Sequence, residues 1–270
     1  MTPTANFVSP SSDISRRGIL SAVVATAGTT VAACAAADAG RPPLPSRIID
    51  LSPTITEDLP VRFWGHRTLS DLGFSDTTEF RVITGSEPAY YSNSYYTLFN
   101  HGGPHVDAPN HGQRGTSGVD AYKLESLVGP ITLIDARGPA VDQRITKGEL
   151  ERTRINAGDV AIVLTGYSPP TGRDELPRYR ALNKEAAEYL AQIPVKAFAT
   201  DTLGVDFWGP STFVYEQSVH HSFLSRGIPA IEQLINLEAL IGVQNAVFVG
   251  LPLKFKDGDG SPIRAAAFVY

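Results

Sequence analysis

The segment that decides the fold reads HGGPHVDAPNH and runs from His101 to His111. Its three histidines and its aspartate stand at positions 101, 105, 107 and 111, which are all odd. A helix would place His101 and His105 one turn apart, but two glycines and a proline lie between them and oppose a helix. In an extended chain the four side chains would point to one face. The segment therefore predicts three imidazoles and one carboxylate that converge.

Such a face favours a divalent metal ion, because imidazole and carboxylate ligands suit Zn²⁺, Mn²⁺ or Fe²⁺. An apolar core does not absorb three imidazoles and a carboxylate unless something charged compensates them. The single cysteine, Cys34, excludes an intrachain disulfide and a thiolate metal cluster. We therefore expect ligands of His, Asp and Glu only. His66 stands alone in the sequence, and we expect it to be a structural or surface residue.

A second pair of histidines, His220 and His221, opens a segment that ends at Glu232. We expect His220 to lie on a short helical stretch that Gly227 terminates, before the chain returns to the core. That path would deliver Glu232 at the start of a helix. Acidic residues are common caps at helix starts, but beside the first histidine cluster Glu232 becomes a candidate ligand.

The rest of the chain reads as one mixed α/β domain over residues 47–270. Short apolar runs that end in polar residues predict buried strands, and apolar residues at helical spacing predict helices. The composition includes 28 acidic and 23 basic side chains, a formal net charge of −5, which does not suggest a nucleic-acid surface. The predicted strands cover residues 48–51, 131–135, 160–164 and 246–251; the predicted helices cover 183–192, with Asn183 as N-cap, and 231–241, closed by Gly242.

Residues 1–46 are typical of an export address followed by a proline-rich linker. Arg16 and Arg17 precede a weakly apolar stretch, residues 18–37, as in a twin-arginine signal. The sequence VAAC, which ends at Cys34, resembles a lipobox, in which the cysteine is acylated and becomes the new N-terminus. A transmembrane anchor and ordinary cleavage without a lipid are the alternatives. We expect a periplasmic or cell-envelope lipoprotein whose membrane contact is a lipid anchor at Cys34.

The pattern H-x-G-x-H-x-D-x-P-x-H over residues 101–111 resembles the signature of the cyclase family of metal-dependent hydrolases, which includes kynurenine formamidase and isatin hydrolase. The resemblance continues through residues 50–53, 164–167, 200–206, 220–232 and 258–264, in that order. It implies a swivelling β/β/α fold and hydrolysis of a carbon–nitrogen bond in an amide or cyclic amide, or of a lactone-like ring.

The resemblance also implies roles for individual residues. It assigns one or two metal ions to this chain, Zn²⁺ or Mn²⁺, with Asp107 bridging when there are two. His111 matches the general base of the family. The implied metal ligands are His101, His105, Asp107, His220 and Glu232.

One position departs from the family pattern, because Pro104 stands where a threonine is usual. Proline lacks both the hydroxyl and the backbone N–H, so one hydrogen bond that shapes this loop is lost. We expect metal binding to survive. Because a tryptophan-pathway enzyme normally works in the cytoplasm and this chain is expected to be exported, we do not expect it to be the housekeeping kynurenine formamidase. Phe63, Trp64 and Trp208 are candidates for an aromatic wall around a planar substrate, or for core packing.

The implied partner is a small-molecule substrate, and we expect a homo-oligomer. The rival function is an exported metal- or solute-binding lipoprotein that holds its ligand without turnover. Such a protein would have lost the base while it kept the ligands, yet His111 is present. A lactone hydrolase on the same scaffold is a further alternative.

Overall fold

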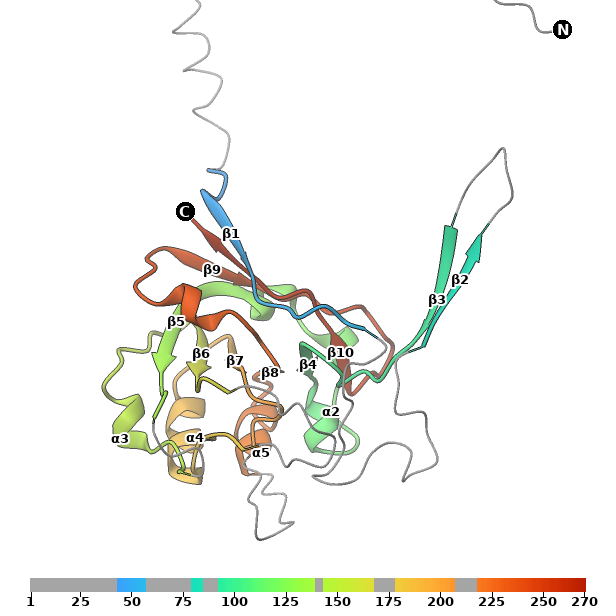
Figure 1. Cartoon of the computed structure of the whole chain (residues 1–270). Coiled ribbons are helices and arrows are strands. Elements are labelled where there is room, and N and C mark those ends of the chain that lie inside the picture. The colour runs from blue at the N-terminus through green and yellow to red at the C-terminus, as the bar shows by residue number, and fades with distance from the viewer. Residues whose placement is uncertain (1–42, 57–78, 85–91, 139–142, 168–177, 207–217) are drawn as a thin grey trace, which may run out of the picture. The chain divides into compact units, whose positions relative to one another are not determined.

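Nine strands join in one sheet in the order β1-β11-β9-β5-β6-β7-β8-β4-β10, and β2 and β3 pair as a separate ribbon (Figure 1). The computed structural model describes residues 43–56, 79–84, 92–138, 143–167, 178–206 and 218–270, and these counts refer to them alone. The strands are β1 (Arg47–Asp50), β2 (Glu79–Thr84), β3 (Ser92–Thr97), β4 (His105–Asp107), β5 (Val128–Asp135), β6 (Val160–Leu164), β7 (Ala197–Thr200), β8 (Ala230–Glu232), β9 (Ala246–Val249), β10 (Gly260–Pro262) and β11 (Ala266–Val269).

The centre of the sheet is buried on both faces. Strands β5, β6, β7 and β8 run parallel, and every residue of β6 is buried, as expected for a parallel strand covered on both sides. Alternate residues of β6 serve two hydrophobic clusters, one with Val160, Ile162 and Leu164 and one with Ala161 and Val163. The sheet therefore separates two cores, as the mixed α/β class requires.

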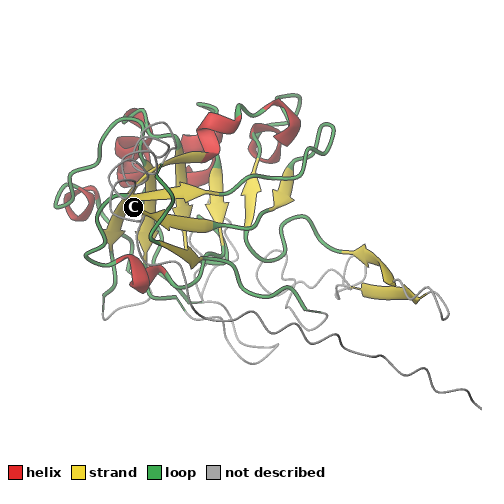
Figure 2. Ribbon diagram, turned by 90° about the horizontal axis from the view of Figure 1, so that it is seen from above, coloured by secondary structure: helices red, strands yellow, loops and turns green. Residues whose placement is uncertain are grey.

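Helices cover one of these two faces, as Figure 2 shows. Leu150, Leu190 and Phe223 come from three different helices and pack in the same cluster as Ala161 and Val163. Each large side chain buried there contributes about 1.5–3 kcal/mol of transfer free energy. The helices are α2 (Pro109–Gly112), α3 (Lys147–Leu150), α4 (Lys184–Gln192) and α5 (Ser218–Leu224), with 3₁₀ helices at Val119–Ala121, Leu124–Leu127 and Leu237–Leu240.

Most predicted elements are confirmed. The four predicted strands correspond to β1, β5, β6 and β9; β6 has the predicted bounds, and the others differ by one to three residues at one or both ends. Helix α4 begins after Asn183, whose side chain accepts a hydrogen bond from the backbone N–H of Ala186, so the predicted N-cap is correct. Helix α5 also has its predicted end, since Gly227 takes a left-handed conformation with φ of 69°.

The predicted helix over residues 231–241 is wrong. Ile231 lies in the short strand β8, and only Leu237–Leu240 is helical, as a 3₁₀ turn. Gln233 and Asn236 have φ values of 60° and 59°, in the left-handed region that a right-handed helix cannot include. Gly242, with φ of 72°, does follow the helical turn. The apolar spacing in this stretch thus serves a strand and a separate turn.

Several predictions fall on residues outside the described ranges. These predictions concern the export address, the structural or surface role of His66, and the aromatic wall of Phe63, Trp64 and Trp208. Among the helices that the structure describes, none has the length and apolar character that a membrane span needs.

Candidate metal centre

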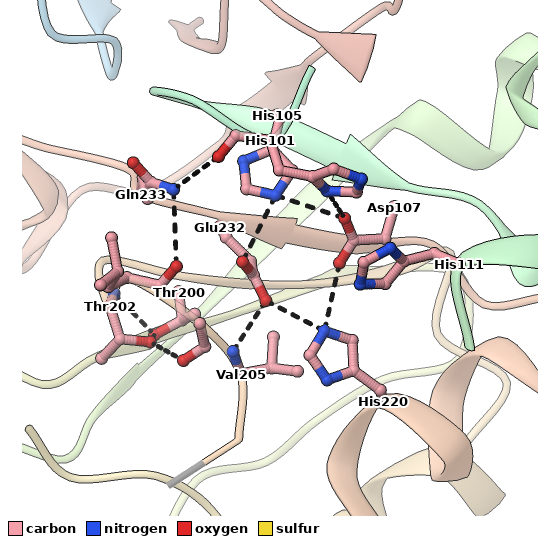
Figure 3. Close-up of polar contacts among 12 residues, drawn as sticks. His101, His105, Asp107, His111, Thr200, Thr202, Val205, His220, Glu232 and Gln233 are labelled. Carbon is pink, nitrogen blue, oxygen red and sulfur yellow. Dashed lines mark hydrogen bonds and ion pairs between the residues drawn. The ribbon is translucent and has the colours of Figure 1, made fainter. Parts of the chain in front are cut away.

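Strand pairing builds the core of the site. His105 and Asp107 are two residues apart on β4, so their side chains share one face of the sheet. The antiparallel register of β4 with β8 sets His105 opposite Glu232. Helix α5 brings His220 to the same place, and Figure 3 shows its ring beside Asp107 and Glu232. All four of these residues are buried.

Three imidazoles present a ring nitrogen to two buried carboxylates. Nδ1 of His101 lies 2.9 Å from Oδ1 of Asp107, and Nε2 of His105 lies 3.2 Å from the same oxygen. Nε2 of His105 is also 3.3 Å from Oε2 of Glu232. Nε2 of His220 lies 3.4 Å from Oδ2 of Asp107 and 3.3 Å from Oε1 of Glu232. The structure thus brings all five predicted ligands together.

The opposite nitrogens of two of these rings have their own acceptors. Nδ1 of His105 lies 2.8 Å from the carbonyl oxygen of Gly103, and a carbonyl can only accept, so this nitrogen carries the proton. Nδ1 of His220 lies 2.5 Å from Oδ2 of Asp206, whose other oxygen accepts the backbone N–H of Val219. Both contacts fix the ring orientation, and they would leave the lone pair on Nε2 available to a metal ion that replaces the proton there, as second partners of metal-binding histidines do.

The carboxylates hold the charge of this cluster. Burial alone would raise the pKa of Asp107, but the charges of His111 and His105 outweigh it and hold that pKa well below its usual range. Burial and Asp107 raise the pKa of Glu232, yet hydrogen bonds from His105 and His220 bring it to about 2. Burial lowers the pKa of His105, and the two carboxylates raise it to about 10. Both acids are therefore anions that recruit positive charge.

The donor set fits a divalent cation. Oδ2 of Asp107 is buried and accepts no hydrogen bond from any described residue. Within the described part of the chain, the ion-pair partners of Asp107 and Glu232 are all histidines. An anionic oxygen in that position is costly unless a cation satisfies it. A metal ion would satisfy it and replace the protons that the histidines otherwise hold.

His111 stands at the edge of this cluster. Its ring centroid is 4.3 Å from that of His101 and 5.3 Å from that of His220, and its side chain is 26% exposed. One nitrogen of His111 also lies within 4.8 Å of donor atoms of Asp107 and His220, a grouping that could hold a metal ion. The structure therefore places His111 where it can reach both the cluster and solvent.

Two details of the predicted site need correction. The segment 101–111 is not extended throughout, because only His105–Asp107 is a strand, while His101 precedes it in a turn and His111 lies on α2. Glu232 ends strand β8 and does not start a helix. His221, which would be the next candidate for proton transfer if His111 proved to be a metal ligand, is exposed on α5, one residue from the buried His220.

Several residues that touch the site were not predicted from the sequence, among them Asp206, Asp259 and Gln233. Asp206 accepts a hydrogen bond from His220, and Asp259 lies 3.1 Å from Nε2 of His101. Nε2 of Gln233 donates to the carbonyl oxygen of His101 at 3.1 Å. Asp206 and Asp259 lie in segments that carry the family resemblance, which was the available signal. Nothing in the sequence pattern singled out Gln233.

Asparagine in place of Asp206 is expected to weaken metal binding about 10- to 100-fold, the usual cost of removing a partner behind a metal-binding histidine. The amide has one acceptor oxygen for two donors, the N–H of Val219 and Nδ1 of His220. A competition titration with a chromophoric chelator measures the change. Asp159→Asn is the matched control, because Asp159 is also buried but bonds Thr132 and Asn156 away from the site. Equal affinities for both variants would contradict the role of Asp206.

The sheet and this buried donor set together define a mixed α/β protein with a candidate metal centre. The chain belongs to the cyclase family, since the family model described as "Putative cyclase" matches residues 49–207. The predicted family and fold class are thereby confirmed.

Individual relatives agree with this assignment. Isatin hydrolase of Roseibium aggregatum is 27% identical over 205 residues, which cover 68% of this chain and 77% of that protein. Kynurenine formamidase of Delftia acidovorans is 30% identical over 174 residues, covering 64% of this chain and 78% of that protein. The solved structure of isatin hydrolase A from Labrenzia aggregata bound to benzyl benzoate is similar with a TM-score of 0.67 and 27% identity, over 83% of this chain and 93% of that chain.

Proposed function

We propose that this protein hydrolyses the carbon–nitrogen bond of an amide or cyclic amide with a divalent metal ion, Zn²⁺ or Mn²⁺, bound at the candidate metal centre. The observation that carries the proposal is the set of three ring nitrogens that face the carboxylates of Asp107 and Glu232. The names of the relatives, an isatin hydrolase and a kynurenine formamidase, support this reaction class.

The proposed ligands form one continuous set that can hold one or two ions. The two oxygens of Asp107 face different histidines, His105 and His220. Asp107 would therefore suit a bridging role if two ions were bound. A bound ion would polarise the scissile carbonyl and lower the pKa of a bound water toward about 7. The ligands proposed are His101, His105, Asp107, His220 and Glu232.

His111 is the proposed proton carrier. It takes a proton from the attacking water as the carbon–oxygen bond forms, and it gives that proton to the leaving nitrogen as the carbon–nitrogen bond breaks. Its partial exposure and its closeness to His101 and His220 place it beside the metal centre and within reach of a substrate that enters from solvent.

Removal and return of the metal test this function. Purified protein, with its metal content measured, is assayed on formanilides, isatin-like rings, simple amides and lactones. We expect hydrolysis of one of the amide classes, its loss on chelation, and its recovery with Zn²⁺ or Mn²⁺. Full activity in protein shown by elemental analysis to be metal-free would contradict the proposal, and turnover of lactones alone would replace the amide assignment.

We also propose that the protein works outside the cytoplasm, anchored through a lipid on Cys34. The support is the Arg16-Arg17 pair, the weakly apolar stretch that follows it, and the position of the only cysteine. Twin-arginine substrates as a class are exported folded, so a metal loaded inside the cell would be protected from metals met outside. The expected homo-oligomer stays a prediction.

Cell fractionation checks this localisation. Replacing Arg16 and Arg17 together by lysine should leave the protein in the cytoplasm, because the signal needs both arginines. Cys34→Ala should release the exported protein from the membrane fraction, because no acyl chain can be attached. A Cys34→Ala protein that stays wholly in the membrane fraction would rule out the lipid anchor.

A further inference from the structure

One oxygen of Asp259 lies close to both histidines at the outer edge of the metal centre. Oδ2 is 3.1 Å from Nε2 of His101 and 3.7 Å from Nδ1 of His111. The other nitrogen of His101 faces Asp107. Asp259 therefore occupies, behind His101, the place that Asp206 occupies behind His220.

Asp259 is held in place although its side chain is 51% exposed. Its Oδ1 accepts a hydrogen bond of 2.7 Å from Nδ2 of Asn100, and its backbone carbonyl accepts the N–H of Ala108 at 2.9 Å. The next residue, Gly260, pairs with Asp107 across β10 and β4. Residues in or next to the segment 101–111 thus hold both the main chain and the carboxylate of Asp259 in place.

His101 also packs closely against Gly260, the residue that follows Asp259. A Cβ atom on Gly260 would lie 2.5 Å from Cε1 of His101, so only glycine lets the ring approach the chain here. An ordinary exposed ion pair contributes little. This pair differs because the ring of His101 is held between two carboxylates, one on each nitrogen.

We propose that Asp259 is a positioning residue that orients the metal ligand His101 and the base His111 through one shared carboxylate oxygen. With Nε2 of His101 donating to Asp259, Nδ1 would give up its proton to Asp107 or solvent and be free to bind the metal ion beside Asp107. The same oxygen lies 3.7 Å from Nδ1 of His111, within ion-pair distance, and would restrain that ring. Asp259 acts in this proposal through these two histidines. The role of His111 in this proposal rests on the proposed function, whereas the role of His101 rests only on metal binding.

Asp259→Asn tests the proposal with two separate measurements. Metal affinity, measured by chelator competition, should fall about 10- to 100-fold. At saturating metal, kcat should still fall about 10-fold with little change in KM, because His111 has lost its restraint. Asp135→Asn is the matched control, since Asp135 is a similarly exposed carboxylate at the end of β5 that pairs with Arg137 and not with a histidine of the site. Both quantities should stay at wild-type values in this control.

A double-mutant cycle separates positioning from a general structural effect. In a His111→Ala background, Asp259→Asn should cost less than about twofold in kcat at saturating metal, because the group through which it acts is gone. An unchanged 10-fold loss in that background would overturn the proposal. So would wild-type metal affinity in Asp259→Asn, or the loss of one whole bound ion per chain, which would make Asp259 a ligand. If the wild type hydrolyses no amide, the proposed function fails, and the affinity ratio alone upholds or overturns the role of Asp259.

Discussion

Asp107→Ala is expected to lose bound metal and activity together. Asp107 is buried, and its two oxygens lie within 3.4 Å of ring nitrogens of His101, His105 and His220, so the variant removes a contact to three of the proposed ligands at once. The loss of activity should exceed the about 10- to 100-fold that follows removal of a group behind a ligand. Elemental analysis and steady-state kinetics on one preparation measure both effects.

The same variant should also be less stable. Without metal, it leaves buried histidines without their anionic partner, a change that typically costs about 3–5 kcal/mol. With metal at about 100 times the dissociation constant, the wild type gains about 2.7 kcal/mol by mass action and the variant gains none. Thermal unfolding without added metal measures the loss of stability, and thermal unfolding with added metal measures the gain from metal binding. Asp107→Asn, which keeps the volume, is the control for cavity formation, and a metal-dependent rise in melting temperature in Asp107→Ala would contradict the ligand role.

His111→Ala should behave differently, because a proton carrier is not needed to hold the metal. We expect metal content near that of the wild type, little change in KM, and a fall in kcat of about 10²- to 10⁴-fold. Metal stoichiometry and kinetics, measured beside Asp107→Ala, make the comparison. His221→Ala is the control, since His221 is exposed on α5 and should keep wild-type kcat.

Loss of metal from His111→Ala would assign His111 a ligand role. The geometry makes this a sharp test, because donor atoms of Asp107, His111 and His220 lie within 4.8 Å of one another. In that case the proton carrier would have to be another residue, and a loss of activity in His221→Ala would identify it.

The sequence predicted the regular parts of the fold well, because their patterns are local. The all-buried run of β6 and the Asn183 cap of α4 can each be recognised within ten residues. The stretch 231–241 could not be assigned, since its apolar spacing fits a helix. Its true structure depends on the left-handed Gln233 and Asn236 and on pairing of β8 with distant strands.

In the candidate site, too, only the part that rests on a local sequence pattern was predicted. The convergence of His101, His105 and Asp107 was predicted, but through an extended chain that the structure shows only at His105–Asp107. Asp206 and Asp259 could not be found by spacing, because Asp206 is 14 residues from His220 and Asp259 is 158 residues from His101, and neither forms a local pattern with its histidine. Contacts between distant segments have to be seen in the folded chain.

The register of β4 with β8 has a consequence for how the chain folds. Because His105 meets Glu232 only when these two distant segments pair, no short stretch of the unfolded chain can gather the full ligand set. Closing so long a loop is entropically costly and slow. A metal ion would therefore be captured late in refolding and would then hold the neighbouring strands β4 and β8 together, slowing their separation. Unfolding rates should depend on metal far more steeply than refolding rates do.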